Sequence, residues 1–360
     1  MEASQSKNIL EYLEKLRPKI DKKIEDYLPR KVSKEWAKEV FGKGDYSLRA
    51  IQKAILDPIW DFLDRGGKRW RPALFLLILE AFGEKQNKFF DFAIIPELAH
   101  NGSLIVDDIE DQGELRRGKP CLHKIFGIDV ALNAGNFLYF FPIYIFEKNK
   151  RKLEKEIYLK AIETYLEEME RLHLGQGTDI FWHKGKESKI SEKEYFQMCA
   201  FKTGCMARLA AKLAAIFAKK KENIVEKVEK FAQNVGIAFQ IQDDILDLEL
   251  TGKEREKFGK SFGNDIKEGK RSLMVIYVLK KAKTEDKKRL IEILNKHTQN
   301  LSEIKEAIEI IKKYRAIEYA KEIAKEIVEE SWKNIKKLFF ESRAKERLKE
   351  FVHFLIERKI

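Results

Sequence analysis

The chain has 360 residues and a formal net charge of +12 at pH 7, with 44% hydrophobic and 36% charged residues. This balance excludes a low-hydrophobicity disordered polymer and an array of membrane-spanning helices. The apolar run 73–79 is too short to cross a bilayer, and the N-terminal residues lack the apolar core of a secretory signal, so we expect no transmembrane segment.

The predicted elements are helices throughout. Residues 1–40 predict an amphipathic helix with a break near Pro29, and 41–47 predict a loop in which Ser47 can cap the next helix. Apolar residues then recur at helical spacing through 48–64, 72–83, 89–107 and 128–147. Further helices are expected at 153–175, 191–219, 223–250, 270–282, 284–298 and 301–358, the last stretch holding more than one.

Residue usage supports the same fold class. Glutamate outnumbers aspartate 42 to 17, and every proline lies at or before Pro142, as in a helical chain. No strand pattern, linker or repeat is visible, so we predict an all-α bundle that forms a single domain over 1–360, with 1–47 as an N-terminal helical extension. The chain has three cysteines, Cys121, Cys199 and Cys205, which lack the spacing of a metal site. So few cysteines, in an odd number, are typical of a cytoplasmic protein rather than of a disulfide-bonded one.

Because aspartate is scarce, its clusters are informative. Two DDxxD motifs end apolar helical runs; their aspartates are Asp107, Asp108 and Asp111, and Asp243, Asp244 and Asp247. On a helix, positions i, i+1 and i+4 lie within about 100° of arc, so each motif projects three carboxylates from one turn. Such convergent carboxylates repel one another unless a cation is present, and Mg²⁺ binds carboxylate oxygens together with water and substrate phosphates. The motifs therefore predict a magnesium site, whereas the alternative is a pair of solvated helix ends.

Basic groups beside these acids complete a predicted phosphate site. The segment GGKRWRP (66–72) opens a helix, and a helix N-terminus with Lys and Arg beside it favours a phosphate anion. Arg116 and Arg117 follow the first acid cluster in a turn-rich loop and can form bidentate phosphate contacts. Most other Lys and Arg residues are interleaved with Glu, as on solvated helix faces, so we expect no nucleic-acid partner.

Together these stretches resemble the trans-isoprenyl diphosphate synthases, a family that includes farnesyl and geranylgeranyl diphosphate synthases. The match runs in family order from Gly66 to Ser272 through GGKRWRP, ELAHNGSLIVDDIEDQGELRRGKPCLH, GQGTDIFW, FKTG, FQIQDDILD and GKSFGNDIKEGKRS. The resemblance implies an isoprenoid-synthase-type helical bundle with a central active-site cavity. It also implies a homodimeric prenyltransferase that condenses isopentenyl diphosphate with allylic diphosphates.

The resemblance also implies residue roles. Asp107 and Asp111 would bind two Mg²⁺ ions and Asp243 a third, whereas the remaining motif carboxylates, Asp108, Asp244 and Asp247, would act through water or at one remove. The allylic diphosphate site maps onto Arg116, Lys202, Thr203, Gln240, Lys260 and Lys270. The isopentenyl diphosphate site maps onto Lys68, Arg71, His100 and Arg117. Without the motif context, the favoured interpretation of His100 is a buried, hydrogen-bonded histidine on an apolar helix.

Product length is expected to depend on the helix before Asp107. Gly102 and Ser103 lie one turn earlier, and their small size leaves the path of a growing apolar tail open. A floor further down is offered by Phe137, Tyr139, Phe140, Phe141 and Tyr144, although ordinary core packing explains these residues as well. We therefore expect geranylgeranyl diphosphate, with a farnesyl or longer product as the alternative. A class I terpene cyclase and a non-catalytic synthase subunit are less compatible with two complete DDxxD motifs.

Overall fold

The computed structural model describes residues 2–187, 189–250 and 262–357, and Lys260 of the expected allylic site lies outside them. The described chain is mostly helical, as predicted, and forms two compact units. Unit 1 comprises Met1–Tyr165, Leu209–Val225 and Phe340–Leu348, and unit 2 comprises Leu166–Arg208, Glu226–Phe339 and Lys349–Ile360. Four helices, α10, α12, α13 and α20, begin in one unit and end in the other, so the single domain over 1–360 stays a prediction.

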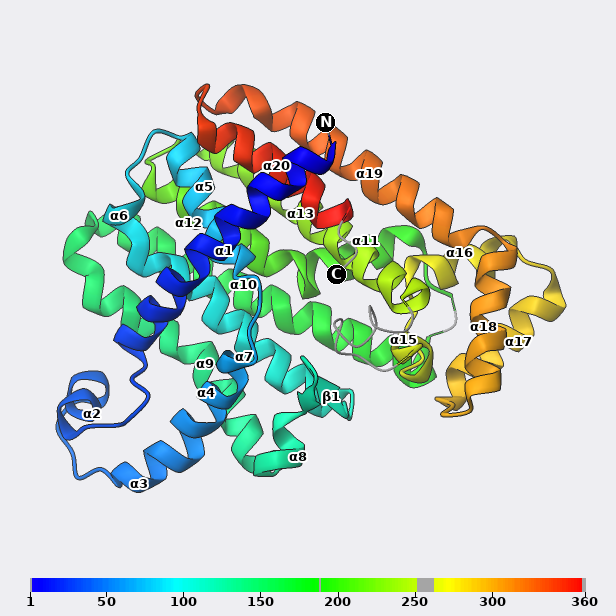
Figure 1. Cartoon of the computed structure of the whole chain (residues 1–360), viewed down its shortest axis with the longest axis horizontal. Helices are drawn as coiled ribbons and strands as arrows, with labels where there is room; N and C mark the ends of the chain where they lie inside the picture. Colours follow the sequence, from blue (N-terminus) through cyan, green and yellow to red (C-terminus); the bar gives the residue numbers. More distant parts are fainter. Residues whose placement is uncertain (1, 188, 251–261, 358–360) are drawn as a thin grey trace. The chain divides into compact units, whose positions relative to one another are not determined.

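Unit 1 contains the first half of the chain (Figure 1). Its leading helices are α1 (Glu2–Tyr27), α2 (Lys34–Phe41), α3 (Leu48–Ile51), the π-helical turn η1 (Gln52–Leu56), α4 (Asp57–Asp64) and α5 (Trp70–Ala81). They are followed by α6 (Gln86–Phe89), the 3₁₀ turn η2 (Phe90–Ile94), α7 (Ile95–Glu110), strands β1 (Leu115–Arg116) and β2 (Lys119–Pro120), α8 (Leu122–Phe126), α9 (Ile128–Asn149) and η3 (Lys150–Lys152).

The remaining elements include the helices that cross between the units and those of unit 2. They are α10 (Lys155–Phe181), the π-helical turn η4 (Trp182–Lys186), α11 (Glu192–Lys202), α12 (Gly204–Phe217), α13 (Glu222–Glu249), α15 (Asn264–Lys267) and α16 (Leu273–Lys281). The last elements are α17 (Thr284–Lys296), α18 (Leu301–Lys313), α19 (Ala316–Ile335), η5 (Lys336–Leu338) and α20 (Arg343–Glu357). Within unit 2, α17 and α18 pack as neighbours, as the yellow and orange ribbons of Figure 1 show.

Local sequence explains several helix ends. Ser47 caps α3 as expected, accepting a hydrogen bond from the backbone N–H of Ala50, and Ser191 forms a capping box with Glu194 at the start of α11. The expected helix 191–219 is broken at Thr203, which separates α11 from α12. The turn-rich loop after the first acid cluster contains a short antiparallel hairpin, β1–β2, which the helical pattern did not predict.

Glycines set the closest helix approaches. A Cβ on Gly102 of α7 would lie 2.8 Å from the carbonyl oxygen of Gly135, and one on Gly135 of α9 would lie 2.8 Å from Cγ2 of Val106. In unit 2, a Cβ on Gly236 of α13 would lie 2.5 Å from Cα of Gly204 at the start of α12. Because these contacts leave no room for a side chain, the two helix pairs that carry the acid motifs depend on glycine at these positions.

Helix α9 has an unusual composition. By length and hydropathy alone, Ile128–Lys152 could cross a membrane, and 44% of that window is buried in the structure. The core helix of a soluble protein passes the same test. The buried side of α9 packs against α7, whereas Ile128, Leu132 and Phe140 are exposed, with Phe140 73% accessible.

Candidate active site

The two acid motifs lie in different units, and each is described within its own unit. In unit 1, Asp107, Asp108 and Asp111 occupy the C-terminal end of α7. A helix C-terminus carries partial negative charge, so three carboxylates there are electrostatically unfavourable without a cation. Arg116 supplies one: its Nε lies 2.7 Å from Oδ1 of Asp108 and its Nη2 lies 3.4 Å from Oδ2 of Asp107. This contact raises the pKa of the Arg116 guanidinium, although burial opposes the shift.

The hairpin directs two adjacent arginines to different partners. Arg117 and Gly118 form its two-residue turn, and both have positive φ, as type I′ turns require. Arg116, on β1, contacts the acids of α7. Arg117 instead donates hydrogen bonds to the carbonyl oxygen of Gly66 and to Oδ1 of Asn101. One short hairpin thus connects the acid cluster with the glycine loop that precedes α5.

The glycine loop 66–69 carries Lys68 and leads into Arg71. Gly66, Gly67 and Arg69 have φ angles of +92°, +131° and +49°, so the loop has a left-handed backbone at three of its four residues. Arg71 is buried, and its guanidinium lies 4.2 Å from the centre of the Trp70 ring. Cations are therefore held at the N-terminus of α5, where backbone N–H groups also favour an anion.

His100 lies among these cations. Desolvation, followed by the positive charges of Arg71, Arg117, Arg116 and Arg69, holds its pKa well below 6.5. The imidazole is therefore neutral at neutral pH and can donate one hydrogen bond. All four residues of the expected isopentenyl diphosphate site lie in unit 1. The charges of Arg71 and Arg117 contribute to the lowered pKa of His100. Lys68 lies on the loop to which Arg117 donates a hydrogen bond.

In unit 2, the second acid motif lies at the C-terminal end of α13. Asp244 is buried; it accepts hydrogen bonds from the hydroxyl of Tyr195, at 3.0 Å, and from Nε2 of Gln240, at 2.7 Å. Burial and then the charge of Asp265 raise the pKa of Asp244 to about 7. Asp247 is also buried and accepts the backbone N–H of Asp265 at 3.0 Å, whereas Asp243 is half-buried.

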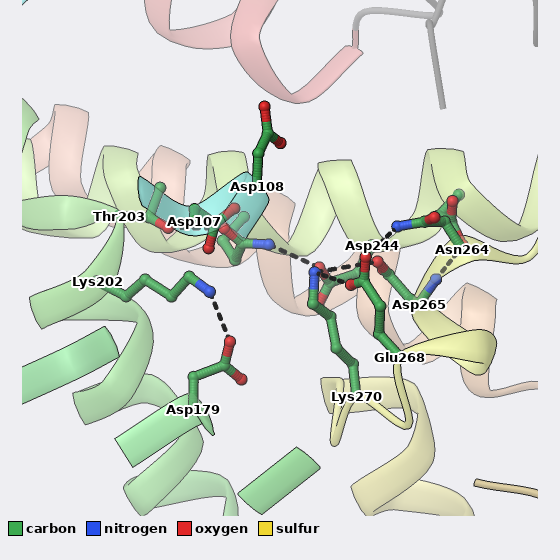
Figure 2. A network of polar contacts seen from close by, with 12 residues as sticks. Asp107, Asp108, Asp179, Lys202, Thr203, Asp244, Asn264, Asp265, Glu268 and Lys270 are labelled. Carbon is green, nitrogen blue, oxygen red and sulfur yellow. Dashed lines mark hydrogen bonds and ion pairs between the residues drawn. The ribbon is translucent and has the colours of Figure 1, made fainter. Parts of the chain in front are cut away.

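The expected allylic residues of unit 2 that the structure describes each have a polar partner (Figure 2). Thr203, at the break between α11 and α12, donates to Oε1 of Gln240 at 2.6 Å. Lys202 forms an ion pair of 2.6 Å with Asp179 of α10. Lys270 lies 2.7 Å from Glu268 and 3.4 Å from Asp265.

Asp179 belongs to the quoted stretch GQGTDIFW, for which no role had been inferred. Burial alone would raise its pKa, but the charges of Lys202 and Lys270 outweigh burial and bring it below the usual range. Gly175, one turn earlier, allows this contact: a Cβ there would lie 2.2 Å from the backbone nitrogen of Lys202. The pairing depends on two segments that are distant in sequence, so spacing could not reveal it.

The acids have the chemistry that Mg²⁺ requires. Among the described residues, no three His, Cys, Asp or Glu side chains form a metal-binding group by themselves. Mg²⁺ commonly uses one or two carboxylates and completes its coordination with water and substrate phosphates. Oδ2 of Asp108 is buried and accepts no hydrogen bond within the described part of the chain, so an acceptor oxygen remains at the end of α7. The donor set fits the ion without a preformed cage.

The two small residues before Asp107 have different surroundings. Gly102 is buried against the backbone of α9, so its small size permits the close packing of α7 and α9. Ser103 is half-buried, and its hydroxyl donates to the carbonyl oxygen of His100 at 2.8 Å. Of the aromatic run, Phe140 points to the surface, whereas Phe137 stacks on Phe141 with ring centres 5.2 Å apart. Phe41 of α2 contacts this stack, with its ring centre 6.3 Å from that of Phe137.

Comparison with known proteins places this arrangement in a family. A family model described as polyprenyl synthetase matches residues 52–311. This chain belongs to the polyprenyl synthetase family. A short chain isoprenyl diphosphate synthase of Methanothermobacter thermautotrophicus is 35% identical over 81% of this chain and 87% of its own.

Solved structures of polyprenyl synthetases share the fold. The geranylgeranyl pyrophosphate synthetase of Pyrococcus horikoshii superposes with a TM-score of 0.84 at 30% identity, covering 98% of this chain and 99% of its own. The geranylgeranyl pyrophosphate synthase of Corynebacterium glutamicum, solved with isoprenyl diphosphate and magnesium, has a TM-score of 0.82 at 21% identity, covering 96% and 99%. The protein is therefore a prenyltransferase of the polyprenyl synthetase family.

Proposed function

We propose that the protein elongates allylic diphosphates with isopentenyl diphosphate and releases mainly geranylgeranyl diphosphate. The observation that carries this proposal is the β1–β2 hairpin, which directs Arg116 to the acids of α7 and Arg117 to the glycine loop. One diphosphate leaves during the reaction and needs its charge neutralised, whereas the other is retained and needs only cations and hydrogen bonds. Two adjacent arginines with different partners fit two neighbouring diphosphate sites.

The proposed site uses the carboxylates of both acid motifs. Asp107, Asp111 and Asp243 would hold Mg²⁺, expected as three ions, with Asp108, Asp244 and Asp247 in support. When bound, the ions neutralise the charge that develops on the departing diphosphate. Arg116, Lys202, Lys260 and Lys270 would bind that group, and Thr203 and Gln240 would present oxygen dipoles to the allylic cation. Lys68, Arg71, His100 and Arg117 would keep isopentenyl diphosphate in place.

The chemistry proceeds by ionisation, condensation and elimination. The bond between C1 of the allylic substrate and its diphosphate oxygen breaks, and the electron pair leaves with the diphosphate. The double bond of isopentenyl diphosphate then attacks C1 and forms the new carbon–carbon bond. A proton leaves the resulting cation, with the released pyrophosphate as its acceptor. In this scheme no side chain of the protein forms a covalent bond with the substrate.

The proposed product length rests on Ser103. It lies one turn before Asp107 and presents a small side chain, so a chain of twenty carbons is not blocked at this depth. On helix α9, the stacked rings of Phe137 and Phe141 are the candidate floor that would stop a longer chain. The names of relatives at 30–35% identity agree with a short-chain product.

The decisive experiment supplies purified protein with Mg²⁺, labelled isopentenyl diphosphate and dimethylallyl, geranyl or farnesyl diphosphate in turn. The products are then sized by chromatography, and a twenty-carbon product is expected from each primer. Asp107→Ala and Asp243→Ala should each reduce turnover at least about 10³-fold while circular dichroism stays helical. Folded wild-type protein that elongates no primer would refute the proposal, and a fifteen- or twenty-five-carbon product would correct its length.

We also propose a homodimer in the cytoplasm. The exposed apolar side chains Ile128, Leu132 and Phe140 recur at intervals of four and eight along α9, so they share one face of the helix. Helix α10 likewise exposes Leu159, Leu166, Leu174 and Phe181 at intervals of seven or eight. Contiguous exposed apolar faces of this kind mark interaction surfaces, and a second copy would cover them. The three cysteines are free thiols and buried, as suits a reducing compartment.

A further inference from the structure

The isopentenyl diphosphate loop is held by a residue to which neither the motif nor the chemistry assigns a role. Arg69 follows Lys68 and has a left-handed backbone, with φ of +49°. This conformation is unfavourable for an L-residue, so compensating contacts must hold it. Arg117, which reaches the same loop, is also left-handed, with φ of +53°. Strained non-glycine residues of this kind cluster where a binding site is held in shape.

The side chain of Arg69 supplies those contacts. It donates to the carbonyl oxygen of Leu63 at 2.9 Å and to that of Gly66 at 3.3 Å. It also donates to Oε1 of Glu97 on α7, at 3.2 Å, and to Oδ1 of Asp21 on α1, at 2.7 Å. A single buried guanidinium, 3% exposed, therefore connects the glycine loop with two helices.

Glu97 extends the network to the other side of the loop. Its Oε1 also accepts a hydrogen bond from Nδ2 of Asn101, at 3.1 Å, and Oδ1 of Asn101 accepts one from Arg117 at 3.4 Å. Arg117 in turn donates to the carbonyl oxygen of Gly66. The carbonyl oxygen of Gly66 thus accepts hydrogen bonds from both Arg69 and Arg117. Arg69 is bonded to the buried carboxylate of Glu97 directly, and Arg117 is connected to it through Asn101.

Asp21 is the part of this network that solvent reaches. Its side chain is 39% exposed, whereas that of Glu97 is 3% exposed. A pocket of about 210 Å³ lies on the Asp21 side of the loop and is lined by residues of α1, α4 and the loop, among them Arg17, Trp60 and Gly66. Removing the Asp21 charge therefore loosens Arg69 without isolating it, because Glu97 still pairs with the guanidinium.

We propose that Arg69 is a positioning residue for the retained diphosphate and that helix α1, through Asp21, braces the loop that binds it. The inference rests on the proposed function, because it assigns isopentenyl diphosphate to Lys68, Arg71 and Arg117. The inference gives the N-terminal extension a function. Asp21 orients the guanidinium of Arg69, which in turn holds the carbonyl groups of Leu63 and Gly66 in place. The loop held in this way positions Lys68. Asp21 does not touch the substrate.

The test compares Asp21→Asn with Asp26→Asn, a matched control on the same helix whose carboxylate pairs only with Lys22 and Lys23 among the described residues. Asp21→Asn should raise KM for isopentenyl diphosphate roughly 3- to 10-fold, the size expected from losing one partly exposed charged contact, and leave kcat within about twofold. KM for the allylic substrate should not change. Asp21→Glu should restore most of the loss, and Asp26→Asn should match the wild type.

Two further measurements separate positioning from stability. Isothermal calorimetry of isopentenyl diphosphate binding, without an allylic substrate, should show the same loss of affinity in Asp21→Asn. Arg69→Lys, which keeps the charge but removes the fork, should weaken binding more than Asp21→Asn does. A lower melting temperature with an unchanged KM and Kd would overturn the inference. Wild-type protein that elongates no primer would instead refute the proposed function, so the two failures are distinguishable.

Discussion

At the scale of single residues, charges are held in conformations that sequence spacing does not describe. Arg116 pairs with the carboxylates of Asp107 and Asp108, and Lys202 pairs with Asp179, so cations expected to bind diphosphate are already held by acids. These acids keep the cations in place before substrate arrives, and a diphosphate can then join them. The same arrangement makes the acids into testable positioning groups.

Asp179 should matter for activity although it is not expected to touch substrate. Asp179→Asn removes the charge that holds Lys202, so we expect kcat/KM for the allylic substrate to fall about 10- to 100-fold. Steady-state kinetics would measure this loss. The control is Asp286→Asn in the same unit, whose carboxylate forms an exposed pair with Lys313 and should leave activity within about twofold. Equal activity of the two variants would contradict the positioning role.

His100 should make folding stability depend on pH. Desolvation and the neighbouring arginines hold its pKa below 6.5 in the folded protein, so below that pH the unfolded chain binds a proton that the folded protein does not. Stability should therefore decrease as pH falls below 6.5, by at most about 1.4 kcal/mol per pH unit from this group. Urea unfolding between pH 7.5 and 5.5 should show a steeper decrease in wild type than in His100→Gln. Parallel profiles would exclude this contribution.

At the scale of elements, the contact between α7 and α9 gives the two small residues before Asp107 different surroundings. Gly102 packs against Gly135, whereas Ser103, on the next position of the same helix, is half-buried. Both residues are small, and sequence alone gave no reason to separate them. The structure separates them because a helix presents adjacent residues about 100° apart.

Ser103→Phe should shorten the product. The aromatic ring would occupy the path of the tail one turn from Asp107, so the main product should shift from twenty to fifteen carbons, as chromatography of labelled products would show. Ser103→Ala adds no bulk and should retain the wild-type product. Gly102→Ala should instead destabilise the fold by about 1–3 kcal/mol, because its Cβ would overlap the backbone of α9. Unchanged chain length in Ser103→Phe would refute this role.

At the scale of the whole molecule, the N-terminal extension and the exposed face of α9 are the features that the catalytic motifs do not explain. Residues 1–47 contribute Asp21 to the loop network and Phe41 to the aromatic stack on α9. Helix α9 is apolar on its buried side and also exposes three large apolar side chains, which explains why its composition also satisfies the criteria for a membrane span. Dimerisation of the protein through the exposed side chains of α9 would cover these apolar groups.

Phe140→Asp should disrupt the proposed dimer. A charge at a side chain that is 73% exposed costs the folded monomer little, but it would be desolvated between two copies. Analytical ultracentrifugation should show a dimer for wild type and a shift toward monomer for the variant. Lys15→Asp, on α1, reverses an exposed charge on a different helix and should remain dimeric. A monomeric wild type at micromolar concentration would contradict the proposal.

The sequence by itself determined the helical fold class, the positions of most helices and the two acid motifs. Helical periodicity and the spacing within each motif are local properties, so they can be read along the chain. The family resemblance grouped Lys68, Arg71, His100 and Arg117, and all four lie in unit 1. The hairpin escaped prediction because its two-residue strands are too short to show alternation.

Only the tertiary structure decided which charged groups meet. Arg69 pairs with Asp21 across 48 positions of sequence, and Lys202 pairs with Asp179 across 23. It also decided that Gly102 packs against Gly135, since that depends on where α9 approaches α7. The physical reason is the same in each case. Spacing along one helix fixes which residues share a face, but the partner of that face comes from a distant segment, and only packing selects it.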